Sequence, residues 1–161
     1  MNIFVKVTPA PKPKTNESQQ IAYFYALILI VFALCQLFTF DSFLILLNSF
    51  GLPGGLATSN LLGGIIVISE ISALPFLLQM RLSPLMRTIS MGLGWLVSLI
   101  WFSLSLWLCL TTDVNLNIGF LGTVVDLIFG WWTVFTSISF GVMATWASWG
   151  MWPFVRLKKI T

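Results

Sequence analysis

Residues 26–34, Ala-Leu-Ile-Leu-Ile-Val-Phe-Ala-Leu, form an unbroken apolar run that decides the fold class. A membrane β-strand alternates apolar and polar side chains over about ten residues, and this run does not alternate. A helix needs about 20 apolar residues to cross a bilayer, and the apolar stretch here covers residues 21–40. Because backbone in lipid must satisfy its own hydrogen bonds, the stretch predicts a transmembrane helix.

Three more stretches of this kind cover residues 61–80, 89–110 and 118–147. Hydrophobic residues make up 58% of the chain and charged residues 8%, whereas soluble domains carry about 25% charged residues. The mean hydropathy of +0.97 agrees. The sequence therefore predicts an all-α, polytopic membrane protein with four transmembrane helices in one bundle over residues 21–161. Residues 1–20, which contain three prolines, are expected to be a disordered cytoplasmic tail.

The basic residues indicate the orientation of these helices. Three precede the first stretch, two flank the connection between the second and third, and three follow the fourth: Lys6, Lys12, Lys14, Arg81, Arg87, Arg156, Lys158 and Lys159. The opposite connections, residues 41–60 and 111–117, contain no lysine or arginine. The positive-inside rule then places both termini in the cytoplasm, as in a multi-pass protein of the cytoplasmic (inner) membrane. The net charge of +3 thus reflects topology, and no nucleic-acid partner is expected.

Several kinds of chemistry are excluded by composition. The chain has no histidine, which removes histidine-ligated haem, most catalytic zinc sites and any nucleophile that a histidine activates. No metal site is expected. The two cysteines, Cys35 and Cys109, fall at different depths in their predicted spans, so we expect free, buried thiols rather than a disulfide.

Two acidic residues within the predicted spans, Glu70 and Asp126, define the candidate polar site. At 1.5 Å per residue, both lie about 12–14 Å below the outer boundary, so we expect one shared polar region that Gln36 also reaches. No basic residue lies deep in a span to pair with them. A buried charge is costly, so at least one acid is expected to hold a proton. The site is either a structural hydrogen-bonding centre or a place where a proton or substrate is handled.

A face of small residues continues from Asp126 along the fourth stretch at spacings of three and four: Gly130, Thr133, Ser137, Gly141, Ala144 and Ser148. Small faces let membrane helices approach closely, so we interpret this one as a helix-packing face. The alternative is a solvated substrate or proton path along it. In the second stretch, Pro75 removes a backbone donor and predicts a kink one turn past Glu70.

Aromatic residues are expected to mark the membrane interfaces. Those near the predicted cytoplasmic ends are Tyr23, Tyr25, Trp146, Trp149 and Trp152. Deeper tryptophans are interpreted as lipid contacts or packing residues: Trp95, Trp101, Trp107, Trp131 and Trp132. No cofactor is required by the sequence, and the alternative for these rings is a quinone or another flat lipophilic ligand stacking on them.

Residues 32–43, Phe-Ala-Leu-Cys-Gln-Leu-Phe-Thr-Phe-Asp-Ser-Phe, resemble the end of the first helix in the DoxX-like and MauE-like membrane proteins. The turn Gly51-Leu52-Pro53 and the pair Glu70-Ile71 in the second stretch resemble further features of that family. The resemblance covers about residues 21–110. It implies a compact four-helix membrane bundle associated with redox systems, including a quinone-linked partner. Gln36 stands where the family usually has lysine, so a Lys–Glu ion pair with Glu70 is not available.

The leading hypothesis is a DoxX-like, non-catalytic accessory or assembly subunit of a membrane complex, with the bilayer and other membrane subunits as partners. The first alternative is a small proton-coupled or small-molecule transporter that uses Glu70 and Asp126. The second is a membrane enzyme in which Glu70 acts as an acid on a lipophilic substrate.

Overall fold

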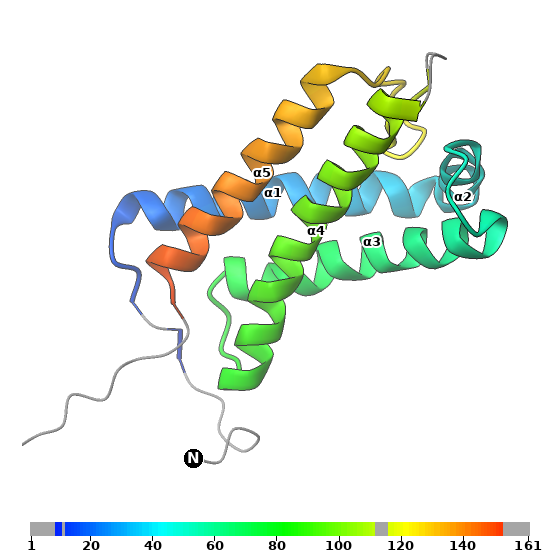
Figure 1. Ribbon diagram of the computed structural model, residues 1–161. Helices are drawn as coiled ribbons and strands as arrows, with labels where there is room; N and C mark the ends of the chain where they lie inside the picture. The colour runs from blue at the N-terminus through cyan, green and yellow to red at the C-terminus, as the bar shows by residue number, and fades with distance from the viewer. Residues whose placement is uncertain (1–8, 11, 112–115, 153–161) are drawn as a thin grey trace, which may run out of the picture.

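The computed structural model describes residues 9–10, 12–111 and 116–152. These residues form five helices (Figure 1): α1 Asn16–Phe38, α2 Phe40–Ser49, α3 Gly55–Leu77, α4 Pro84–Thr111 and α5 Trp131–Gly150. One isolated antiparallel β-bridge joins Asn117 and Ile128. The predicted all-α class is confirmed.

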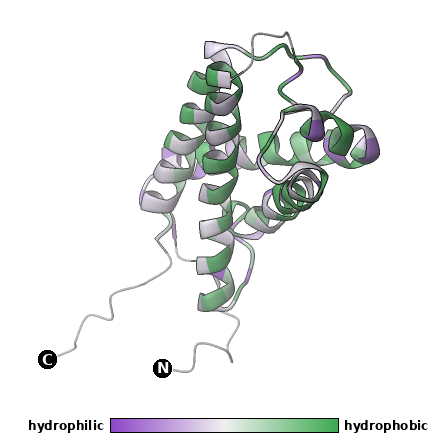
Figure 2. Ribbon diagram, turned by 45° about the vertical axis from the view of Figure 1, so that its right-hand side comes forward, coloured by the Kyte–Doolittle hydropathy of each residue, from purple (hydrophilic) through white to green (hydrophobic). Residues whose placement is uncertain are grey.

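Three of the described helices, α1, α3 and α4, are long and apolar enough to cross a membrane. Their outer faces expose large apolar side chains, among them Phe24, Ile68 and Leu99 at 57%, 64% and 56%. Hydrophobic residues follow the helices along much of their length (Figure 2). Exposed apolar surface on this scale is typical of helices that face lipid, and the chain is accordingly a helical membrane protein.

The four long helices enclose a common core. α1 packs against α3 and α5, and α4 packs against the same two helices. In Figure 1, α1 and α3 run alongside each other and α4 and α5 cross in front of them. The largest fully buried side chains in this core include Trp101, Tyr25 and Leu29. Elements far apart in the sequence therefore meet in the interior at the middle of α1, α3 and α4.

The first helix begins earlier than residue 21, the predicted start. Thr15 caps it, and its side chain accepts a hydrogen bond from the Ser18 backbone N–H at 3.2 Å. The Lys14 N–H also donates to the Gly150 carbonyl at 3.0 Å, which ties this end to the last turn of α5. Residues 16–20 are thus helical, which corrects their assignment to a disordered tail; residues 1–8 and 11 lie outside the described part.

The predicted outer loop, residues 41–60, instead contains the helix α2 and the start of α3. Thr39 separates α1 from α2, with φ −118° and ψ 30°, and its hydroxyl donates to the Cys35 carbonyl at 2.9 Å. Phe43 and Leu47 of α2 are fully buried. The apolar residues there belong to a short helix packed on α3.

The prediction of a fourth helix starting at residue 118 is wrong. Described residues 116–130 form a loop, and α5 starts only at Trp131. The Asn117 amide bonds the Gly122 and Val125 carbonyls at 3.3 and 3.1 Å, and its Oδ1 accepts from the Gly119 N–H at 2.9 Å. Asparagine offers the backbone such partners in competition with a helix. Gly119 and Gly122 also adopt left-handed φ of 85° and 57°.

Pro75 lies in the last turn of α3, which ends at Leu77 rather than at residue 80. The hydroxyl of Ser90, on α4, lies at this turn. It accepts from the Phe76 N–H at 3.0 Å and donates to the Ser72 carbonyl at 2.6 Å. A side chain of α4 thus enters the backbone ladder of α3 next to the proline, which is a recognised cause of local helix distortion.

Candidate functional site

Glu70 is fully buried on α3 and lies between α1 and α4. Its Oε1 accepts hydrogen bonds from Gln36 Nε2 at 3.3 Å and from Trp101 Nε1 at 3.1 Å. The structure therefore brings Gln36 to Glu70, as we expected from their depths. Trp101 was interpreted as a lipid contact or a packing residue, and its role as a hydrogen-bond donor to the acid was missed.

The loop that precedes α5 is the fourth segment of this site, after α1, α3 and α4. Gln36 Nε2 also donates to the Phe120 carbonyl at 3.0 Å. Ile118 and Phe120 are 0% and 2% exposed, so this part of the loop lies inside the helix assembly. The Thr123 N–H donates to Thr39 Oγ1 at 3.2 Å, which fixes the loop to the end of α1. Four segments of the chain thus converge on one buried amide–carboxyl pair.

Aromatic rings close this polar centre. Phe120 stacks on Phe32, with ring centroids 5.5 Å apart and planes 6° apart. The same ring meets Trp101 edge-on at 4.8 Å and Phe140 at 5.8 Å. Tyr25 also packs near Phe140 and donates its hydroxyl to the Gly94 carbonyl at 2.8 Å. A polar pair enclosed by such rings sits in a low-dielectric environment, where hydrogen bonds are strong and unpaired charges are costly.

Two buried oxygens of the centre, Glu70 Oε2 and Gln36 Oε1, have no hydrogen-bond partner among the described residues. No lysine or arginine of the described part bonds to Glu70. An ionised carboxylate only accepts hydrogen bonds, whereas a protonated one gains an O–H donor. A proton on Glu70 therefore removes the buried charge and supplies a donor beside an acceptor that lacks one.

Asp126 does not belong to this centre. It lies exposed in the loop before α5, where its Oδ1 accepts from Asn117 Nδ2 at 3.2 Å. The expected shared region of two acids is corrected: the buried polar pair is Glu70 and Gln36. Our depth estimate failed because it assumed a helix from residue 118, and the chain there is a loop.

The small-residue face of α5 packs against α4. Four of its members are 0–5% exposed: Thr133, Ser137, Ala144 and Ser148. Ser137 Oγ lies 3.3 Å from Ser105 Oγ, and Trp95 Nε1 donates to Ser148 Oγ at 3.0 Å. Gly130 precedes the helix, and Gly141 faces open space. The hydrogen bonds that Ser137 and Ser148 make with α4 favour the interpretation of this face as a packing face.

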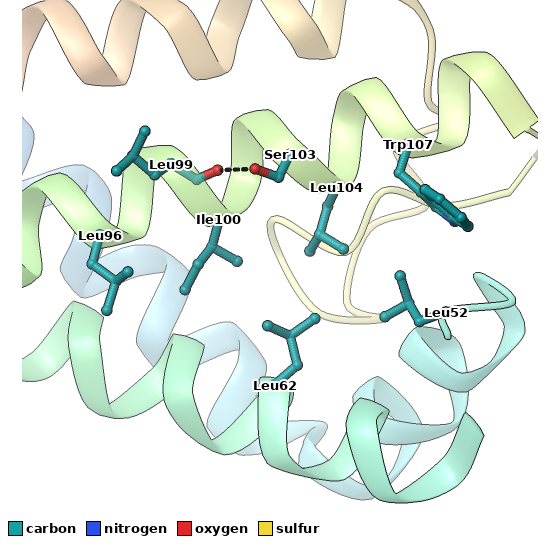
Figure 3. A pocket seen from close by; sticks show the side chains of 8 residues that line it. All are labelled: Leu52, Leu62, Leu96, Leu99, Ile100, Ser103, Leu104 and Trp107. Carbon is teal, nitrogen blue, oxygen red and sulfur yellow. Dashed lines mark hydrogen bonds between the residues drawn. The ribbon is translucent and has the colours of Figure 1, made fainter. Parts of the chain in front are cut away.

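A groove on the surface of the described residues is largely apolar. This groove of about 380 Å³ lies between α3 and α4 (Figure 3), and it is lined by Leu52, Leu62, Leu96, Leu99, Ile100, Ser103, Leu104 and Trp107. Its polar groups are internally bonded, because Ser103 donates to the Leu99 carbonyl and Trp107 to the Phe50 carbonyl. Glu70 does not line it. The groove suits a hydrocarbon chain, and it gives no access to the buried Glu70 side chain.

Cys35 and Cys109 are both free and half-buried. We expect them to stay unlinked in the protein isolated from membranes, because they are on different helices and neither contacts a second thiol. Intact-mass measurement with a thiol-alkylating reagent, without prior reduction, should find two modified cysteines after denaturation. A species two mass units lighter that resists alkylation would contradict this.

No three His, Cys, Asp or Glu side chains gather within the described residues as a metal site requires. Comparison of the chain with family models, with curated proteins and with solved structures finds no match. The function is therefore argued from the geometry of the site.

Proposed function

We propose that the chain is a four-span protein of the cytoplasmic (inner) membrane that acts as a non-catalytic accessory or assembly subunit. One observation carries this proposal: Glu70 is fully buried, bonded to Gln36 and Trp101, and enclosed by aromatic rings. An acid that handles substrate needs access to it, whereas an acid that holds helices together does not. The three segments that meet at Glu70 make it a centre of tertiary structure.

A fourth span is supported by the character of α5. The helix has 20 residues, none of them charged. Its outer face exposes Trp131, Trp132, Phe135, Ile138, Val142, Trp146 and Trp149. Serine and threonine lower its hydropathy, but several of these side chains face α4 or bond to their own helix. A helix of about 20 residues with an apolar outer face and satisfied hydroxyls fits a bilayer.

The proposed orientation has both termini in the cytoplasm. The start of α1 and the end of α5 lie at one end of the molecule (Figure 1), where Lys14 N–H bonds the Gly150 carbonyl. Arg87, near the start of α4, donates to the Pro9 carbonyl at 3.2 Å and so belongs to the same end. Collecting basic residues at one end is what the positive-inside rule associates with the cytoplasmic side.

This orientation predicts a labelling pattern. In a background with both native cysteines changed to alanine, Asn48→Cys should react in intact cells with a membrane-impermeant thiol reagent, because Asn48 is exposed on α2. Ser83→Cys, in the α3–α4 connection, should react only after the cells are opened. The reverse pattern would contradict the orientation. Asn115, a second outer position by sequence, lies outside the described residues.

The resemblance to DoxX-like proteins supports the accessory role within this proposal. Glu70, which matches the family's central acid, contacts Gln36, which stands where the family usually has lysine. An amide replaces the family's lysine, so the contact is a hydrogen bond without an ion pair. We propose a quinone-linked redox complex as the assembly in which the chain serves.

Proton handling is the second candidate function. The observation that favours it is the unpartnered Glu70 Oε2, which a proton would convert into a donor. In this case the acid would have to become accessible in another conformation of the bundle.

Isolation in a mild detergent separates the two candidates. The accessory role predicts that the chain migrates in a stoichiometric complex with other membrane subunits, well above its own mass of 18.0 kDa. Recovery as an isolated bundle, with proton uptake in reconstituted vesicles that Glu70→Gln abolishes, would instead favour proton handling.

A further inference from the structure

A hollow of about 380 Å³ lies on the outer face of α5 near its last turn. Val142, Thr145, Trp146 and Trp149 line it, and their spacing of three and four places them on one face of the helix. The two indoles meet edge-on, with centroids 6.3 Å apart. Thr145 donates its hydroxyl to the Gly141 carbonyl, so the lining that remains is hydrocarbon and aromatic. The hollow therefore suits an acyl chain.

A cation lies over one of the two rings that line this hollow. Lys14 Nζ lies 4.5 Å from the centroid of the Trp149 ring, a cation–π contact. The Lys14 backbone N–H donates to the Gly150 carbonyl at 3.0 Å, so the residue is anchored to the last turn of α5. Within the described part of the chain, no acidic side chain forms an ion pair with Lys14.

The two indole rings of the hollow offer further hydrogen-bond donors. The indole N–H groups of Trp146 and Trp149 make no hydrogen bond to any described residue, and the two side chains are 43% and 53% exposed. An apolar hollow thus carries two unbonded indole N–H groups on its own lining, and one ammonium group lies against the Trp149 ring. This combination complements a lipid, whose acyl chain is apolar and whose headgroup offers phosphate and ester oxygens.

We infer that this end of α5 is a binding site for one anionic phospholipid, with an acyl chain along Trp146 and Trp149 and the phosphate at Lys14. The inference rests on the proposed membrane insertion, because it places Lys14 at the level of the cytoplasmic headgroups. A lysine near an anionic membrane surface changes affinity by about fivefold. The site therefore selects anionic over zwitterionic lipid through one residue.

Native mass spectrometry of the whole protein, released from detergent micelles, tests the site. Phosphatidylglycerol and phosphatidylcholine with identical acyl chains are titrated separately. We expect one phosphatidylglycerol to be retained more tightly than phosphatidylcholine. Lys14→Gln should weaken phosphatidylglycerol binding about fivefold. Lys12→Gln is the matched control, because Lys12 is exposed and close in sequence, and it should leave binding unchanged.

A second variant tests the hollow itself. Trp149→Leu removes the ring beneath Lys14 and one indole donor at a half-exposed position, so folding should persist while phosphatidylglycerol binding falls. Equal losses in the two lysine variants, or equal retention of both lipids by the native chain, would overturn the site. Those outcomes leave the membrane proposal intact. A chain that fractionates with soluble proteins, in contrast, would overturn the proposed function.

Discussion

Replacing Glu70 with leucine is expected to destabilise the protein by about 2–4 kcal/mol. The change removes the acceptor of the hydrogen bonds from Gln36 and Trp101. Gln36 Nε2 keeps its bond to the Phe120 carbonyl, but one of its two N–H groups and the Trp101 N–H would remain buried without an acceptor. Each buried donor left without a partner costs about 1–3 kcal/mol. Reversible unfolding in mixed micelles, followed by circular dichroism, would measure the loss. Values at the lower end are expected if the unfolded chain in micelles also finds partners for these groups.

Glu70→Gln is the decisive companion variant. The amide oxygen can accept the same two hydrogen bonds, and the amide adds no buried charge, so we expect stability within about 1 kcal/mol of the native chain. Asp126→Leu is the matched control for removing an acid, because Asp126 is exposed in the loop and should change stability by about 0.5 kcal/mol or less. Equal destabilisation by leucine and glutamine at position 70 would mean that the negative charge itself is required.

Gly122→Val is expected to destabilise the protein by about 2–4 kcal/mol. Gly122 has a left-handed φ of 57°, which strains a β-branched residue. A Cβ there would collide with Thr39 Oγ1 and approach the Cys35 carbonyl oxygen at 3.1 Å and Gln36 Cα at 3.2 Å. Relief requires the loop to move off α1. That movement would also break the bond from Gln36 to the Phe120 carbonyl.

Gly64→Ala provides the control for this loop variant. Gly64 lies within α3, and a Cβ there would meet no atom within 4 Å. Alanine is the better helix former by about 1 kcal/mol, so the variant should be unchanged or slightly more stable. The same unfolding assay compares both glycines. A Gly122→Val chain as stable as the native one would show that the loop is not anchored to α1 as described.

Hydropathy predicted the elements that depend on composition alone. α1, α3 and α4 follow from long apolar runs, with errors only at their ends, where Thr15 and Pro75 act locally. Residues 118–130 of the loop before α5 were mistaken for helix because they are almost as apolar as a span. Its apolar residues are needed because Ile118 and Phe120 insert among the helices. A hydropathy profile cannot distinguish an inserted loop from the first turns of a span.

Side-chain chemistry predicted only part of the candidate site. Gln36 and Glu70 could be paired because polar side chains deep in a membrane protein form hydrogen bonds with one another. Trp101 was not recognised as a donor because its indole N–H belongs to a largely apolar side chain. The Phe120 carbonyl could not be found from side-chain chemistry at all. Asp126 was misplaced because its depth had been counted along a helix that does not exist there.

We propose that Glu70 holds the helices together and performs no chemistry. The most direct test of this proposal is a Glu70→Gln chain expressed at the native level in cells that lack the native chain. We expect the variant to enter the membrane, to join the same complex in the same amount and to restore fully the function lost on deletion. A variant that inserts, folds and assembles normally but fails to restore that function would contradict the proposal.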